Sequence, residues 1–136
     1  NNKSAKVVGA LLVGIIVLVI GLLWLGYKEN ELLIQKDALT ISGMYGETIP
    51  FSAIDSIALV NELPEISMKS DGFALGNASK GHFKTKAGER IKLIVNKKQA
   101  PYLFVLTNEG KKIYYSSDSA QTRGRYLKLA SVLTTN

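Results

Sequence analysis

The residues with the clearest chemical character are the basic ones that follow position 80. His82 and Lys84 alternate with less polar neighbours, and so do Arg90 and Lys92, which predicts that segment 82–95 forms a hairpin with its charges on one face. We expect this face to point outward and to continue into the basic residues that follow the hairpin. The candidate lipid or partner surface consists of Lys84, Arg90, Lys92, Lys97 and Lys98.

Three interpretations of this basic surface are open. A solvated basic face is the commonest meaning of such a pattern. Alternatively, the cations contact anionic lipid head groups, each contributing about 1 kcal/mol when it lies near the membrane surface. In the third interpretation they bind an acidic segment of a protein partner. Nucleic acid is not an expected partner, because aromatic residues do not interleave with the basic ones.

The sequence offers little support for catalysis or metal binding. His82 is the single histidine and the chain has no cysteine, which argues against a transition-metal site and excludes disulfides. The acidic residues are scattered, without a pair spaced for general acid and base work. The glycine-containing segment 76–81 lacks the Gly-Lys-Ser/Thr spacing of a phosphate-binding loop. We therefore expect no catalytic residues, no cofactor and no enzymatic activity.

The register of the hairpin can be predicted from the two faces. A two-residue turn at positions 87 and 88 would pair Lys84 with Ile91 and mix charged with apolar side chains. A three-residue loop that contains Gly88 pairs basic with basic residues, and Phe83 with Ile91 or Leu93. The three-residue loop is therefore the prediction.

These residues must be positioned by a chain with two parts. Residues 7–27 contain no charge and span about 31 Å as a helix, close to the thickness of a bilayer core. Trp24 and Tyr27 stand where aromatic residues anchor a membrane interface. The run is too long for a cleaved signal and ends without a small-x-small site, so a retained transmembrane helix after a polar leader, 1–6, is favoured. The lysines on both flanks leave its orientation open.

The rest of the chain reads as one β domain, 32–134, after a short linker, 28–31. About seven short strands separated by turn residues are expected, followed by a helix at about 118–134 that Ser117 or Asp118 caps. The fold class is mainly β, a bent sheet or partly open barrel with one end covered by that helix. The helix is expected to bury one face, which is formed by Tyr126, Leu127, Ala130 and Leu133.

Several segments together resemble the bacterial pleckstrin-homology-like domains that follow transmembrane helices. The resemblance rests on Leu39-Thr40-Ile41-Ser42-Gly43-Met44-Tyr45-Gly46, Ile49-Pro50-Phe51 through Ile54 and Ile57, Leu63-Pro64, Gly72-Phe73, Gly81-His82-Phe83 and Pro101-Tyr102. It implies two orthogonal antiparallel sheets with a capping helix and a bacterial inner membrane location; it slightly favours the cytoplasmic side for the domain, which the sequence itself leaves undetermined. In phosphoinositide-binding relatives the early loops hold several basic residues, whereas here these loops contain Lys36 as their single basic residue. The usual reason to expect inositol phosphate binding is therefore missing.

The expected function follows from the anchor and from the fold class. We expect a membrane-anchored, non-enzymatic scaffold or protein-interaction module, with a protein partner or a second copy of the chain as its ligand. The alternative is a regulatory domain that contacts anionic lipid through the basic face. Only four residues separate the apolar run from the first strand, so the domain is expected to lie close to the bilayer.

Overall fold

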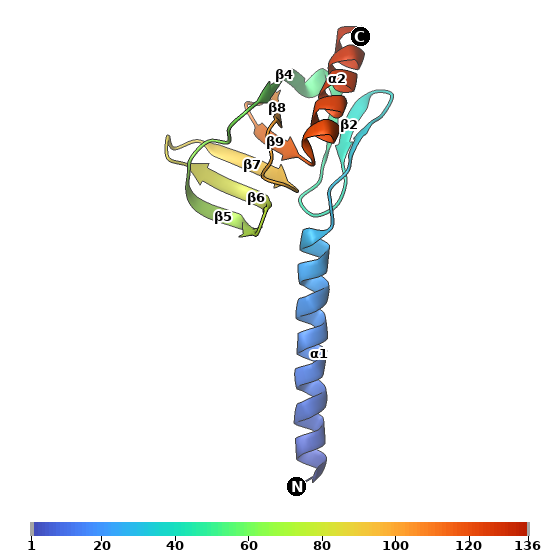
Figure 1. Ribbon diagram of the computed structural model, residues 1–136, viewed down its shortest axis with the longest axis vertical. Coiled ribbons are helices and arrows are strands. Elements are labelled where there is room, and N and C mark those ends of the chain that lie inside the picture. The colour runs from blue at the N-terminus through green and yellow to red at the C-terminus, as the bar shows by residue number, and fades with distance from the viewer. Residues whose placement is uncertain (1, 136) are drawn as a thin grey trace.

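The computed structural model describes residues 2–135, apart from the side chains of residues 25–27, 69, 70, 73, 75 and 135. Helix α1, Asn2–Tyr27, projects from the domain as an isolated rod (Figure 1). One helix in the described part is long and apolar enough to cross a membrane, over Asn2–Trp24, and none of it is buried against the domain. The helix includes residues 2–6 of the expected leader, because neither proline nor glycine interrupts them.

A three-stranded sheet follows the linker directly. It consists of β1, Leu32–Ile34, β2, Ala38–Ile41, and β3, Thr48–Pro50, in the order β1-β2-β3. Both pairs are antiparallel, with Leu32 opposite Ile41 and Leu39 opposite Ile49. The first strand starts at the expected residue, so the linker has the expected four residues. Such short strands are stable here only because one face of the sheet packs against the rest of the domain.

A six-stranded sheet forms the body of the domain, in the order β4-β8-β9-β7-β6-β5. After a single 3-10 turn, Phe51–Ala53, its strands are β4, Ile54–Val60, β5, Ile66–Leu75, β6, Ala78–Thr85, β7, Arg90–Val95, β8, Tyr102–Thr107, and β9, Lys112–Ser116. The mainly β fold class is confirmed, and the two sheets do not close into a barrel.

Two details of the sheets differ from expectation. The described residues form nine strands instead of about seven, partly because β1 and β3 have three residues each, too few for a periodic signal. The pair β7–β9 is parallel, whereas every other pair is antiparallel. The β8–β9 hairpin inserts between β4 and β7, and this placement brings β9 alongside β7 in the same direction.

The β6–β7 hairpin has the predicted register. Lys84 lies opposite Arg90 and Phe83 lies opposite Ile91. The N–H of Thr85 donates to the carbonyl of Glu89 at 2.8 Å, which closes a three-residue loop at 86–88. Gly88 takes the left-handed conformation with φ of 88°, the geometry that such loops require. The predicted pairing of basic with basic residues is confirmed.

The six-stranded sheet has a core on each face. One core lies between this sheet, the small sheet and the C-terminal helix; its buried members are Leu32, Leu39, Ile41, Ile49, Ile94, Leu103, Val105, Ile113, Tyr115 and Leu129. The other core is smaller and consists of Phe83, Ile91, Leu93, Val95 and Tyr102. Because alternate residues of a strand point to opposite faces, the odd-numbered apolar residues of β7 belong to the smaller core. Its even-numbered residues, Arg90 and Lys92 among them, point to the same side as the larger core.

Helix α2, Ser119–Thr135, packs on the larger core and ends at the far end of the molecule from α1 (Figure 1). Asp118 caps it, since its carboxylate accepts from the N–H of Gln121 at 2.8 Å. The expected buried face is partly wrong. Leu127 is 61% exposed, and the fully buried residues are Thr122 and Leu129. The buried face follows the spacing 122, 126, 129 and 133, which is rotated from the expected one.

Candidate functional site

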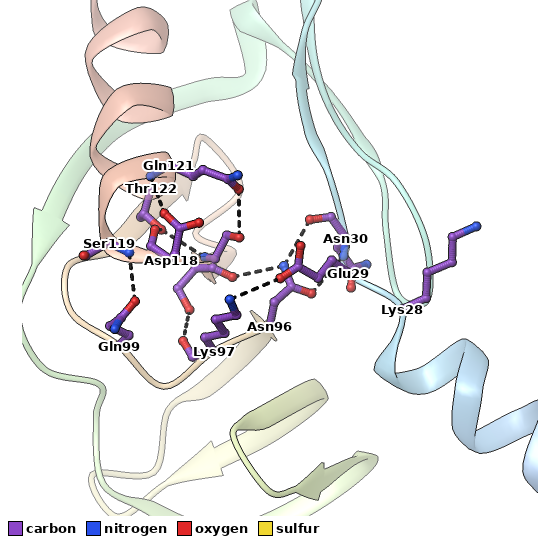
Figure 2. Close-up of polar contacts among 12 residues, drawn as sticks. Lys28, Glu29, Asn30, Asn96, Lys97, Gln99, Asp118, Ser119, Gln121 and Thr122 are labelled. Carbon is purple, nitrogen blue, oxygen red and sulfur yellow. Dashed lines mark hydrogen bonds and ion pairs between the residues drawn. The ribbon is translucent and has the colours of Figure 1, made fainter.

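The linker between α1 and the first strand is built into the domain. The side chain of Asn96, which follows β7, accepts from the N–H of Asn30 at 2.8 Å and donates to the Asn30 carbonyl at 3.0 Å (Figure 2). The hydroxyl of Tyr115 donates to the same carbonyl at 2.9 Å. Asn30 is only 1% exposed. Three bonds to two other segments therefore hold this short linker in one position.

The side chain of Asn30 fixes the loop between β2 and β3. Its Nδ2 donates to the carbonyls of Ser42 at 2.6 Å and Met44 at 2.8 Å. Gly43 between them has φ of +80°, and a Cβ there would lie 3.0 Å from Asn30 Nδ2. Glycine is therefore required for both conformation and space. The Oδ1 of Asn30 has no hydrogen-bond partner among the described residues.

Lys80 attaches the first linker residue, directly after α1, to the large sheet. It is 0% exposed, and its Nζ donates to the carbonyl of Lys28 at 2.7 Å. The N–H of Lys28 in turn donates to the carbonyl of Trp24 at 2.9 Å, continuing the helical bonding of α1. Burial lowers the pKa of Lys80 to about 8, an effect that the nearby Glu29 carboxylate partly offsets. The buried ammonium group of Lys80 thus serves to hold one backbone carbonyl of the linker in place.

We call this assembly the joint, defined by Lys28, Asn30, Lys80, Asn96 and Tyr115. Burial raises the pKa of Tyr115 to about 12, so its hydroxyl remains a donor at physiological pH. The sequence analysis missed the joint, because its partners lie 66 and 85 residues apart along the chain. The one available signal was that Lys80 falls on the same strand face as His82 and Lys84.

The second feature is a cleft of about 700 Å³ on the β5–β6–β7 part of the large sheet and the β8–β9 turn. The cleft, as we use the term, is lined by Met68, Asp71, His82, Phe83, Lys84, Arg90, Ile91, Lys92, Glu109, Gly110, Lys111 and Lys112. Five lysine and arginine residues face two carboxylates in this lining. Among the described residues, neither Lys84 nor Arg90 has an ion-pair partner.

Lys92 is not on an outer face, and this expectation is wrong. The residue is 7% exposed, and its Nζ lies 3.6 Å from the carboxylate of Glu47, which also binds Lys111. Burial lowers the pKa of Lys92, and the Glu47 carboxylate opposes that shift. The alternation of the hairpin was interpreted correctly, but the charged face points toward the small sheet. Glu47, just before β3, therefore covers one end of this charged face.

His82 lies beside a carboxylate in this cleft. Its Nδ1 is 3.8 Å from Asp71 Oδ2, its ring packs edge-on against Tyr45, and the Tyr45 hydroxyl donates to Asp71 at 3.3 Å. Burial, followed by the Asp71 charge, raises the pKa of Tyr45. The His82–Asp71 separation exceeds a hydrogen bond, and the His82 side chain is half exposed. A general base is normally held more tightly than this.

The predicted surface residues fall into two groups. Lys84, Arg90 and Lys92 meet in the cleft, whereas Lys97 and Lys98 belong to the β7–β8 loop at the opposite end of β7. Lys97 pairs with Glu29 of the linker at 3.9 Å, beside the joint (Figure 2).

The predicted interface aromatics lie at the end of α1. Trp24 is 63% exposed, with the Lys28 ammonium 5.7 Å from its ring centroid. The side chain of Tyr27 lies outside the described residues.

No group of three or more His, Cys, Asp or Glu side chains that could hold a metal ion occurs among residues 2–135. Comparison with known proteins found no matching family model, no matching curated protein and no matching solved structure. The joint and the cleft are therefore the features from which a function can be inferred.

Proposed function

We propose that this chain is a membrane-anchored, non-enzymatic scaffold of the pleckstrin-homology-like type. Helix α1 spans the bilayer, and the β domain presents a protein-interaction surface at a fixed place close to the membrane. The observation that carries this proposal is the joint, in which buried hydrogen bonds tie the linker that directly follows α1 to the large sheet.

Attachment of the domain to the membrane does not require buried hydrogen bonds of the kind found in the joint. Four linker residues without contacts would keep the domain at the membrane equally well, and their mobility would cost no free energy. Burying an ammonium group and an asparagine side chain is instead expensive unless their bonds are satisfied. The design makes sense where the position of the domain relative to the bilayer matters to a partner.

The arrangement in space gives this fixed position a direction. Strands β5 and β6 lie beside the end of α1, and α2 extends to the opposite end of the molecule (Figure 1). The bond from Lys80, near the start of β6, to Lys28 brings the β5–β6 turn to the same place. With α1 in a bilayer, these strands lie near the head groups and α2 points away from them.

The test is photo-crosslinking of the full chain in its native membrane. A photoreactive amino acid replaces the exposed Met68 in the cleft, and crosslinked bands are compared with those of a variant that has a six-residue Gly-Ser insertion between Tyr27 and Lys28. The insertion leaves the joint intact but frees the domain from α1. We expect discrete bands, to a protein partner or a second copy, that the insertion weakens.

The control places the same photoreactive residue at Lys128, an exposed position on α2. Bands that are equally strong with and without the insertion would mean that the helix is only a tether. Absence of any band at both positions would remove the scaffold proposal altogether.

A second candidate function is contact with anionic lipid, and one observation favours it. Lys97 and Lys98 lie in the loop beside the joint, and the Lys28 side chain points away from the joint (Figure 2). These cations would then lie near the head groups.

Flotation of the full chain with liposomes does not test this lipid contact, because α1 inserts into any bilayer. The test is fluorescence of an environment-sensitive label at Gln99 in nanodiscs with and without anionic lipid. A response that survives Lys97→Glu and Lys98→Glu contradicts lipid contact.

A further inference from the structure

The cleft contains two cross-strand pairs that bring basic side chains together. His82 lies opposite Lys92, and Lys84 lies opposite Arg90. Like charges directly opposite each other destabilise an antiparallel pair. Asp71 lies beside His82 and Glu47 compensates Lys92, but Lys84 and Arg90 have no ion-pair partner among the described residues. The sheet therefore carries an uncompensated positive charge where an anionic ligand would relieve the repulsion.

The spacing of these pairs sets the shape of the ligand. The two rows are two residues apart along their strands, which corresponds to about 7 Å at roughly 3.4 Å per residue. An extended peptide repeats its side chains on one face at the same interval of two residues. Asp or Glu residues at alternate positions of such a peptide would match both rows.

The depth of the cleft favours a ligand that enters it over a flat charged surface. The cleft has a volume of about 700 Å³ and Lys92 in its lining is almost completely buried, so a bilayer surface that rests on the rim does not fill it. Met68 at the same site is exposed and offers an apolar contact to a chain lying between the charges. Asp71 and Glu109 also line the cleft, and they disfavour ligands with negative charge at every position.

We propose that the cleft binds an extended acidic segment of a partner protein, with Asp or Glu at alternate positions. This inference rests on the proposed scaffold function and names the chemistry of its partner. The Lys84–Arg90 row binds one carboxylate, and the half-exposed His82 in the neighbouring row receives the next along the peptide.

The experiment measures binding of fluorescent peptides to the full chain in nanodiscs of zwitterionic lipid. The first peptide alternates Glu and Thr over nine residues, a second has Gln in place of Glu, and a third has the same Glu residues in one block. We expect the alternating peptide to bind at least tenfold more tightly than either of the others. Equal affinity for the alternating and blocked peptides overturns the spacing argument.

Matched charge reversals locate the site. Lys84→Glu with Arg90→Glu should weaken binding at least tenfold, and the milder pair Lys84→Gln with Arg90→Gln should do so severalfold. Lys36→Glu with Lys98→Glu changes the net charge equally at exposed lysines outside the cleft and should leave affinity within twofold. Equal loss in both sets means that binding is only non-specific attraction, which overturns the proposal.

Two further outcomes separate this inference from the proposed function. If the label at Gln99 responds to anionic nanodiscs only when Lys84 and Arg90 are intact and no peptide binds, the cleft contacts membrane and the peptide inference is wrong. If no peptide binds but crosslinks from Lys128 still identify a partner, the scaffold stands and its binding surface lies outside the cleft.

Discussion

Lys80 and Lys84 lie four residues apart on the same face of β6, yet the structure places them in opposite environments. Lys80 is fully buried and donates its bond to a backbone carbonyl in the joint. Lys84 is exposed in the cleft and has no ion-pair partner in the part of the chain that the structure describes. The linker covers the first position and leaves the second open. One strand thus contributes a cation that holds the molecule together and another that is available to a ligand.

This contrast separates what the two regions are built for. In the joint nearly all buried polar groups are paired, so removing any partner leaves another group stranded in the interior. In the cleft, like charges are held together at a cost to stability, which is typical of a surface whose compensation comes from outside. Substitutions should therefore damage stability in the joint and leave it nearly unchanged at Lys84 and Arg90 in the cleft.

The largest effect is expected for Asn96→Ala in the joint. The buried N–H of Asn30 then loses the Asn96 side chain as its partner, and we expect a loss of about 2–3 kcal/mol in unfolding free energy. The measurement is chemical denaturation of the full chain in detergent micelles. Asn108→Ala is the control, because this exposed asparagine bonds the Ser52 carbonyl, and it should cost at most about 1 kcal/mol. Equal losses would mean that the buried bonds of the joint contribute no more to stability than an exposed bond does.

Stability should also rise with pH because of Lys80. Its pKa is about 8 in the fold and about 10.5 when unfolded, so between these values the unfolded chain binds more protons and the fold gains stability as pH increases. We expect a gain of about 2 kcal/mol between pH 7 and 9.5, below the range where Tyr115 titrates. Denaturation curves of Lys80→Met should lose this gain, and those of Lys84→Met should keep it. An unchanged slope in Lys80→Met contradicts the assignment.

Gly43→Ala tests the loop that encloses Asn30. The left-handed conformation alone costs alanine about 1–2 kcal/mol, and the new Cβ also presses on Asn30 Nδ2 at 3.0 Å. Gly88→Ala is a matched control, since φ there is +88° and the Cβ would meet open space. Thermal unfolding should show a larger loss at Gly43, and the difference measures the Asn30 contact. A larger loss at Gly88 would contradict this account.

The smallest effect is expected in the cleft. Lys84→Thr removes one of two like charges opposite each other, so we expect the unfolding free energy to rise by a few tenths of a kcal/mol. Lys92→Thr should instead cost about 1 kcal/mol, because it removes a buried partner of Glu47. A marked loss for Lys84→Thr would show that the open cations support the fold after all.

The sequence predicts the local features of this fold well. The apolar run, the first strand at Leu32 and the capping of α2 by Asp118 follow from hydrophobic patterns and capping chemistry over a few residues. The hairpin register follows because only a three-residue loop keeps the basic and apolar faces of 82–95 apart. Each of these features depends on residues that are close in the chain.

The joint and the buried end of the cleft could not be predicted in the same way. Burial of Lys80 and Lys92 depends on where the linker and the loop before β3 cross the large sheet, which no local pattern encodes. The Asn30–Asn96 pair connects residues 66 positions apart and looks like two ordinary polar loop residues in the sequence. The same limit produced the error about the outer face of the hairpin.

The central claim is that the joint fixes the domain relative to α1, and a distance distribution tests it most directly. The chain has no cysteine, so spin labels can be attached at Leu12→Cys in α1 and Asn77→Cys in the β5–β6 turn without other changes. Pulsed electron paramagnetic resonance in nanodiscs should give one narrow distance distribution for the parent chain. It should become broad after the Gly-Ser insertion between Tyr27 and Lys28. A parent distribution as broad as that of the insertion variant would contradict the claim.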